Sequence, residues 1–373
     1  MTDLLKTPLH TMHLAAGARM APFAGYDMPL RYLEGSVAEH NHARSRAALF
    51  DVSHMGQLRL MGPDADAALE TLVPGDIQGL GAGTMRYTLL TAESGGILDD
   101  LIVSRVPDGL GVVVNAACKE RDTEHLRRHL GGRVDIIAEP DRALLALQGP
   151  AAAAVLAAFA DLPFMSWREG KACGVPARVS RSGYTGEDGF ELSVAAEDAE
   201  TLAQRLLTHE AVAWAGLGAR DSLRLEAGLC LYGHDIGEDT TPLEAGLGWT
   251  MPKHRRVERN FPGAARILDT PPARRRVGIR PEGRVIARED TTLLDEANTP
   301  VGRVTSGGFA PVLGGPISMG YLPVALAAPG TALTFDIRGT LRPGRVAPSP
   351  SFPTTISEAE NSYGRQDLLH ART

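Results

Sequence analysis

Glycine and proline interrupt this 373-residue chain very often, with 41 glycines and 25 prolines. Glycine tolerates positive φ and proline fixes φ near −65°, so both residues favour turns. Short apolar runs between frequent turns are typical of paired strands rather than of a helical bundle. A chain of this length also exceeds one ordinary hydrophobic core, so we expect two or three domains.

Strand-like and helical patterns alternate along the first 250 residues. Residues 101–106 and 110–115 alternate as a pair of strands, and the charged segment 119–130 that follows has helical spacing. The same order recurs where strand 190–194 precedes a helical segment at 198–208. Helices that cover one face of paired strands predict an α+β fold rather than a doubly wound sheet.

The composition changes after about residue 250. Basic runs occur at 253–259 and 274–276, and a Pro-Pro pair at 271–272 has the character of a linker. Beyond it, short strands alternate with glycine and proline turns, which predicts a small β-barrel or sandwich. The last segment, 351–373, is polar and has no periodicity, so we expect disorder there.

Charge and cysteine content exclude several classes of function. A net charge of −7 argues against bulk electrostatic binding to nucleic acid or to an anionic membrane. Cys118, Cys173 and Cys230 are far apart and odd in number, which argues against a disulfide framework or a thiolate zinc site. The N-terminus lacks an apolar signal-peptide core, and no apolar run reaches about 18 residues. We therefore expect a cytoplasmic protein in a reducing compartment.

Two adjacent carboxylates, Asp99 and Asp100, follow a pair of glycines at 95–96 in what the pattern predicts to be a turn. Neighbouring side chains in a strand or turn point to opposite faces, so these two carboxylates cannot both face the same way. One is expected to cap the turn while the other points into a cleft, although a simple Asx-type turn also explains an isolated Asp-Asp pair. A hairpin turn at 107–109 brings Asn115 back to the level of Asp100.

Two arginines, Arg220 and Arg224, have the i, i+4 spacing that places them on one face of a helix. Like charges so placed are unfavourable unless an anion lies between them, and a guanidinium fork suits a carboxylate. The alternative is that Asp221 and Glu226 neutralise both arginines in a solvated network. The spacing alone does not separate these interpretations.

A third segment, 183–191, contains three glycines, followed by the strand that carries Glu191. Its glycines permit close backbone approach, and Tyr184 offers a ring face to a planar ligand. Glu191 can accept a pair of donors from an aminopyrimidine, although a tight hairpin with an exposed acid is the simpler interpretation. His125 and His129 have the spacing of helical metal ligands but lack a third ligand, so we expect no metal site.

Taken together, these segments resemble the glycine cleavage T-protein family, the aminomethyltransferases. The resemblance runs in order from about residue 7 to 346. The matching segments are Phe50–Met55, Gly95–Asp100, Val113–Ala116, Gly183–Glu191, Gly216–Gly228, Leu231–Gly233, Val304–Gly308 and Met319–Tyr321.

The resemblance implies a three-domain ring around a central folate channel, with two α+β domains and a C-terminal small antiparallel β-barrel. It places a discontinuous α+β domain at 1–50 with 140–250 and a second α+β, folate-binding domain at 51–139. A linker region at 251–279 and the barrel at 280–350 follow. Where the family carries a Pro-Phe-Val-Pro segment, this chain has Pro-Ser-Phe-Pro at 350–353, so no site residue is expected there.

The resemblance also implies a reaction. A lipoylated H protein carries an aminomethyl group on its lipoyl arm, tetrahydrofolate takes the methylene as co-substrate, and ammonia leaves. The P and L proteins of glycine cleavage are functional associates, and neither nucleic acid nor membrane is a partner. The alternatives on the same fold are a folate-binding protein without transferase activity and a folate-dependent demethylase.

Individual roles follow from the matching positions. Asp100 resembles the catalytic acid near the folate N5/N10 edge, and Glu191 resembles the acid that holds the pterin donors. Arg220 resembles the arginine that engages the folate. The remaining residues resemble those that line the pocket: Asn115, Tyr87, Tyr184 and the apolar Met55. We further expect the basic runs at 253–259 and 274–276 to contact the H protein.

Overall fold

The computed structural model describes residues 3–348, and these residues form two compact units. One unit comprises the residues up to Thr88 together with Asp99–Arg220. The other comprises Leu89–Leu98 together with the residues from Asp221 onward. The predicted α+β class is confirmed, and so is the antiparallel barrel near the C-terminus. The ring, the folate channel and the division into three domains stay predictions.

The first unit contains a six-stranded sheet in the order β10-β11-β12-β9-β3-β13. Its neighbours are antiparallel except for β13, which pairs parallel with β3. The strands are β3 (Ala47–Asp51), β9 (Arg142–Gln148), β10 (Ser166–Ala172), β11 (Val175–Arg181), β12 (Gly189–Ala195) and β13 (Val212–Trp214).

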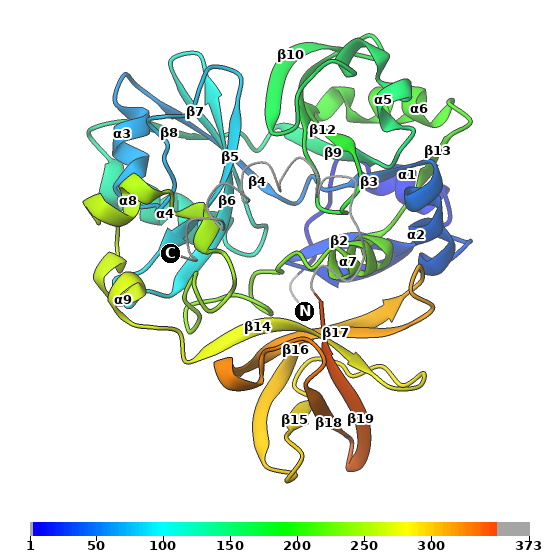
Figure 1. The fold of residues 1–373 in the computed structure, drawn as a ribbon. Helices are drawn as coiled ribbons and strands as arrows, with labels where there is room; N and C mark the ends of the chain where they lie inside the picture. The colour runs from blue at the N-terminus through cyan, green and yellow to red at the C-terminus, as the bar shows by residue number, and fades with distance from the viewer. Residues whose placement is uncertain (1–2, 349–373) are drawn as a thin grey trace. The chain divides into compact units, whose positions relative to one another are not determined.

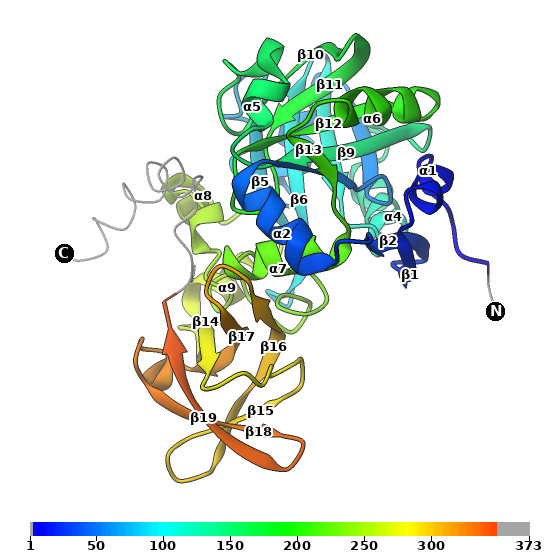
Figure 2. The same cartoon turned by 90° about the vertical axis from the view of Figure 1, so that its right-hand side faces the viewer.

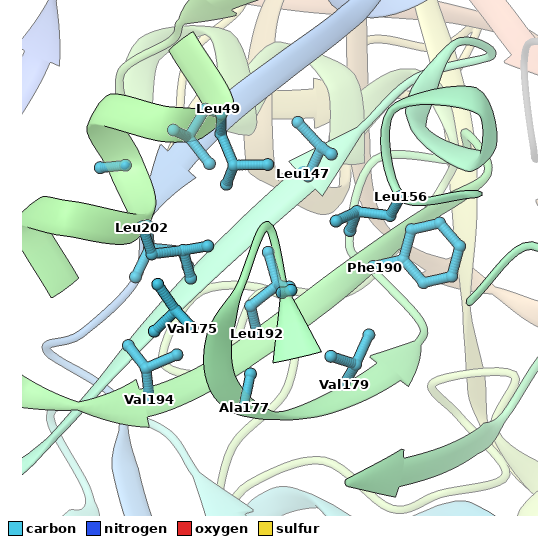
Figure 3. Close-up of a cluster of buried hydrophobic side chains, with 14 of the residues drawn as sticks. Leu49, Leu147, Leu156, Val175, Ala177, Val179, Phe190, Leu192, Val194 and Leu202 are labelled. Carbon is cyan, nitrogen blue, oxygen red and sulfur yellow. The ribbon is translucent and has the colours of Figure 1, made fainter. Parts of the chain in front are cut away.

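One face of this sheet packs against the helices α5 (Ala152–Val155) and α6 (Ala199–Leu207). On β12, Phe190, Leu192 and Val194 alternate toward the helices, because side chains of a strand repeat with period two. Figure 3 shows these side chains interleaved with those of β9, β11 and α6. Each buried Leu or Phe contributes about 1.5–3 kcal/mol through the hydrophobic effect. The same alternation places Glu191 on the opposite face of β12.

A second sheet has the order β5-β6-β7-β4-β8, and the tip of its β5–β6 hairpin, Leu89–Leu98, belongs to the second unit. The strands are β4 (Gly56–Met61), β5 (Met85–Thr91), β6 (Ile97–Val106), β7 (Gly109–Val114) and β8 (Asp135–Ala138). The charged helix predicted at 119–130 is present as α4 (Lys119–Leu130). The remaining elements up to residue 226 are α1 (His10–Ala15), β1 (Arg19–Phe23), β2 (Tyr26–Arg31), α2 (Ser36–Ser45), α3 (Ala65–Glu70) and α7 (Leu217–Glu226).

The second unit contains a closed barrel in the order β14-β17-β16-β15-β18-β19, drawn in yellow to red in Figure 1. Its interior is filled by apolar side chains that include Ile279, Leu293, Val304 and Phe335. The strands are β14 (Arg274–Pro281), β15 (Thr292–Leu294), β16 (Pro300–Ala310), β17 (Gly315–Pro323), β18 (Ala332–Ile337) and β19 (Thr340–Ala347), which Figure 2 shows from a second side.

The region before the barrel differs from the expected linker. The first barrel strand begins at Arg274, earlier than the predicted boundary at 280. Two short helices, α8 (Lys253–Glu258) and α9 (Ala264–Asp269), form where we predicted a linker at 251–279, and they bury Phe261 and Ile267 in a small core. The predicted tail at 351–373 lies outside the described residues. No helix within residues 3–348 combines the length and the apolar character needed to cross a membrane.

Candidate active site

The Asp-Asp pair lies within strand β6 and not in the turn where the sequence placed it. The turn ends at Gly95, whose φ of +85° only glycine adopts at low cost, and regular strand begins at Ile97. The strand places Asp99 and Asp100 on opposite faces, as expected, with Asp99 buried and Asp100 half-buried.

Two of the predicted site residues contact the Asp100 carboxylate directly. Tyr87 of β5 donates its hydroxyl to Oδ2 at 3.0 Å. Asn115, which follows β7, donates Nδ2–H to Oδ1 at 2.6 Å. Because β5, β6 and β7 are neighbours in the sheet, the three side chains converge from adjacent strands. Both hydrogen bonds also fix the orientation of the carboxylate.

The surroundings of Asp100 make its proton affinity unusual for a carboxylate. Burial is the largest cause and the charge of Asp99 the second, and together they raise the pKa of Asp100 to about 7. The hydrogen bonds from Tyr87 and Asn115 favour the charged form and oppose this rise. A carboxyl group that titrates near neutrality can both accept and donate a proton under physiological conditions.

Three other predicted residues form a second group on the same unit. Glu191 on β12 is half-buried and accepts a hydrogen bond from the Ser182 hydroxyl at 3.2 Å. The Arg220 guanidinium lies 4.9 Å from the centre of the Tyr184 ring. Burial lowers the pKa of Arg220, while Glu191 and Tyr184 oppose that shift. One face of Tyr184 is therefore occupied by Arg220 and is not open to a planar ligand.

Arg220 also carries a buried polar atom whose hydrogen-bonding capacity is unused. Its Nη1 is enclosed and has no hydrogen-bond partner among residues 3–348. An unsatisfied buried donor on a charged group costs about 1–3 kcal/mol or more. This atom and the Glu191 carboxylate offer one donor and one acceptor, which suits a ligand that carries both an anionic group and an N–H edge.

Arg224 is paired with carboxylates. Its guanidinium contacts Asp221 at 2.8 Å and Asp235 at 2.7 Å, and it donates to the Ser306 hydroxyl at 2.9 Å. The Arg224 side chain is buried in the second unit, where two carboxylates neutralise it. Of the two carboxylates in the alternative interpretation, Asp221 pairs with Arg224, and Glu226 accepts a backbone N–H from Val312 at 3.1 Å.

Met55 lies half-buried in the turn between β3 and β4, and its place in a pocket stays a prediction. Its neighbour His54 has no sequence pattern that marks it as a site residue. His54 is buried against the rings of Phe23 and Tyr26. Its pKa falls to about 4, mainly through burial, with Asp51 opposing and the charge of Arg220 adding to the fall. His54 is therefore a neutral neighbour of the arginine.

Several arginines of the two basic runs take part in the fold, and the docking surface for the H protein stays a prediction. Arg255 is completely buried and pairs with Glu258 at 3.0 Å. Arg256 donates to the Met251 carbonyl at 2.7 Å. In the second run, Arg276 donates to the carbonyl of Gly228 at 2.8 Å and Arg274 pairs with Glu244. These guanidiniums contact local carbonyls and carboxylates, whereas Lys253, Arg259 and Arg275 of the same runs are exposed.

His125 and His129 are linked by one hydrogen bond, in which His129 Nδ1–H donates to the His125 backbone carbonyl at 2.8 Å. Within residues 3–348 one other group has the composition of a metal site, formed by Asp99, Cys118 and Asp122. The sequence does not reveal this group, because its members come from β6 and the start of α4 and share no sequence motif.

Comparison with known families gives matches over most of the chain. Residues 9–255 match the family described as GCVT N-terminal domain, and residues 274–352 match the glycine cleavage T-protein C-terminal barrel domain.

Individual proteins are similar over nearly the full length. The chain is 47% identical to the mitochondrial aminomethyltransferase of Gallus gallus, over 94% of this chain and 93% of that protein. It is 45% identical to the mitochondrial aminomethyltransferase of Homo sapiens, over 94% and 91% of the two chains. The crystal structure of glycine cleavage system aminomethyltransferase T from Bartonella henselae superposes with a TM-score of 0.90 at 43% identity, covering 94% of this chain and 99% of that one.

Proposed function

The chain belongs to the glycine cleavage T-protein family and is an aminomethyltransferase, and we propose that it takes its aminomethyl group from the lipoyl arm of an H protein and passes the methylene to tetrahydrofolate. Ammonia leaves, the dihydrolipoyl arm is returned, and 5,10-methylene-tetrahydrofolate is the product. The observation that carries this proposal is the Asp100 carboxylate, held by Tyr87 and Asn115 and titrating near pH 7.

Asp100 has the properties that the transfer needs at the nitrogen nucleophile. A fixed carboxylate stabilises positive charge that develops on the attacking nitrogen, because the site does not have to reorganise as the charge forms. Its pKa of about 7 also allows it to accept the proton that the nitrogen loses. Tyr87 and Asn115 hold the acceptor oxygens in place and do not themselves need to move a proton.

Glu191 and Arg220 offer an acceptor and a donor to a folate. A carboxylate beside an aminopyrimidine accepts two parallel N–H donors, a strong and directional contact when partly buried. The unsatisfied Nη1 of Arg220 supplies a donor for an anionic or carbonyl oxygen of the same ligand. The residues present therefore fit tetrahydrofolate, with Met55 and Tyr184 as further lining residues.

The partners and the location also belong to the proposal. The H protein is the direct partner because it carries the donor group, while the P and L proteins act on the same carrier in other steps. We retain a cytoplasmic location as a proposal, although the similar animal proteins are named mitochondrial.

A product assay tests the proposal. Purified protein, H protein loaded with the aminomethyl group and tetrahydrofolate are mixed, and ammonia and 5,10-methylene-tetrahydrofolate are quantified. One equivalent of each product per loaded H protein is expected. Tight tetrahydrofolate binding without either product would identify a folate-binding protein instead, and product formation that does not depend on the H protein would contradict the proposed donor.

A further inference from the structure

Directly behind Asp100 lies a buried cluster of titratable side chains that the proposed mechanism does not use. Asp99 on β6 and Cys118 and Asp122 at the start of α4 each place a ligand-type atom within 4.8 Å of the others. All three side chains are buried, Asp99 completely and Asp122 to 99%. Two ionised carboxylates this close in a dry interior would repel each other strongly, so the pair cannot hold two charges.

Asp122 is the member that keeps a proton. Its Oδ2 is enclosed and receives no hydrogen bond from an N–H or hydroxyl donor among residues 3–348. Its Oδ1 lies 3.7 Å from Nε of Arg121, and the charge and hydrogen bonding of Arg121 lower the pKa of Asp122 and so oppose retention of the proton. Burial, followed by the hydrogen bond to Asp99 and the charge of Asp99, raises the pKa of Asp122 well above that of an ordinary carboxyl group.

Asp99 has the opposite surroundings, because it accepts hydrogen bonds at both oxygens. The Asn115 backbone N–H donates to Oδ2 at 3.0 Å, and Asn115 Nδ2–H donates to Oδ1 at 2.8 Å. The second hydrogen of the same amide reaches Asp100 Oδ1 at 2.6 Å. Asn115 thus bridges Asp99 to Asp100, and only an acceptor at position 99 fixes the amide in that orientation.

We propose that Asp99 and Asp122 are positioning residues for the transfer reaction. The two carboxyl groups share one proton, which Asp122 retains. The negative charge that remains on Asp99 orients the Asn115 amide toward Asp100 and disfavours ionisation of Asp100. The inference rests on the proposed role of Asp100. Its consequence is that the buried carboxylate of Asp99 sets the pH range in which Asp100 can accept a proton.

Few titratable or charged groups face Asp100 and the Asp99–Asp122 pair among the described residues. Asp100 faces Asp99, Tyr87 and the neutral Asn115. The Asp99–Asp122 pair faces Arg121 and Cys118, and burial and the neighbouring carboxylates raise the pKa of Cys118, so its thiol stays neutral.

A proton explains the cluster better than a bound cation does. Both Asp99 oxygens already accept N–H groups, and the Arg121 guanidinium brings positive charge to Asp122. A divalent ion would have to displace or repel these donors. The cluster is therefore suited to holding a proton between two carboxylates.

The test compares two variants that differ only at position 99. Asp122→Asn keeps the shape and a donor toward Asp99, while the Asp99→Asn/Asp122→Asn double variant also removes the buried charge. The Asp100 carboxyl is followed by 13C NMR in protein labelled at aspartate side chains, with Asp100→Asn identifying its signal. The pH midpoint of the Asp100 titration in Asp122→Asn should match that of the wild type. In the double variant this midpoint should fall by about one pH unit or more.

Three results would overturn the proposal. The double variant can leave the Asp100 midpoint in place, which would mean that Asp99 does not act on it. Asp122→Asn alone can shift the midpoint as far as the double variant does, which would place the charge on Asp122. A stoichiometric divalent metal in the purified protein would replace the shared proton by a cation site.

A second measurement covers the case in which the double variant does not fold. Asp122 is protonated in the folded protein and ionised in the unfolded chain at neutral pH, so unfolding releases a proton and stability falls as the pH rises above 3.8, the ordinary value. The Asp122→Asn protein lacks this loss. Its gain in urea midpoint over the wild type should therefore grow between pH 5 and pH 8, and a gain that does not change with pH would contradict the proposal.

Neither measurement needs turnover. A wild-type protein that forms no product would end the proposed function while these titrations still report on the pair. Conversely, normal turnover with an unmoved Asp100 midpoint would end this inference alone.

Discussion

The hydroxyl of Tyr87 is the clearest single contact by which to perturb Asp100 without removing its carboxylate. Tyr87→Phe deletes the donor at 3.0 Å and keeps the ring. The hydrogen bond favours the charged carboxylate, so its loss raises the pKa of Asp100 further above its present value of about 7. The acidic limb of the pH profile of the transfer rate must then move to higher pH.

The size of the shift follows from the strength of one hydrogen bond to a charged group. Such a bond contributes about 1.5–3 kcal/mol. At 1.36 kcal/mol per unit this corresponds to about 1–2 pKa units, which places Asp100 in the variant at about 8–9. At pH 7 the ionised fraction would fall from about one half to between about one tenth and one hundredth, so a step that needs the carboxylate slows about 5- to 50-fold.

The assay is the single-turnover rate of methylene transfer from loaded H protein, measured from pH 6 to pH 9.5 at saturating tetrahydrofolate. The variant should approach the wild-type rate at the alkaline end. Tyr32→Phe is the matched control, because it removes a hydroxyl that contacts His13 Nδ1 at 2.9 Å and not Asp100. A Tyr87→Phe rate that is lowered equally at every pH, or an acidic limb that stays in place, would refute the reasoning.

Three further predictions concern the rest of the first unit. Glu191→Gln should raise the Kd for tetrahydrofolate by about 10- to 100-fold by calorimetry while the single-turnover rate at saturation is kept, since it weakens a charged hydrogen bond to the ligand; unchanged affinity would remove Glu191 from the site. Burial raises the pKa of Asp51, but the hydrogen bond and charge of His13 at 2.9 Å outweigh it, so the net pKa is lowered; Asp51→Asn should therefore cost about 3–5 kcal/mol of unfolding free energy at pH 7, a difference that disappears as the pH falls through the acid range. Gly183→Ala should lower both the Tm and the affinity for tetrahydrofolate, because its Cβ would lie 1.9 Å from Oε1 of the buried Gln148, whereas retention of both would show that the hairpin can shift.

Local pattern was sufficient to predict the elements and part of the site. The helix at 119–130 is defined by its own periodicity, and the hairpin between β6 and β7 returned Asn115 to Asp100 as expected. The confirmed family and fold class rest on collinear motifs rather than on periodicity. The roles of Asp100, Glu191 and Arg220 toward folate stay proposals until they are measured.

What could not be predicted depends on contacts between distant segments. The carboxyl group of Asp122, in the first turn of α4, lies within 4.8 Å of that of Asp99 on β6, and no local spacing indicates this. Arg224 contacts Asp235, eleven residues further along the chain and beyond the end of its helix, a partner that the i, i+4 spacing with Arg220 does not indicate. Basic runs appear solvated in a sequence, yet Arg255 is fully buried because Glu258 neutralises it within the same helix.

The central claim is that the Asp100 carboxylate acts in the transfer step rather than in holding the folate. The most direct test is a single-turnover experiment with Asp100→Asn, run beside a tetrahydrofolate binding titration. We predict a rate lowered about 10²- to 10³-fold, the range for one preorganised polar group, with the Kd close to that of the wild type. A variant that turns over at the wild-type rate, or one that loses activity only because it no longer binds tetrahydrofolate, would contradict the account.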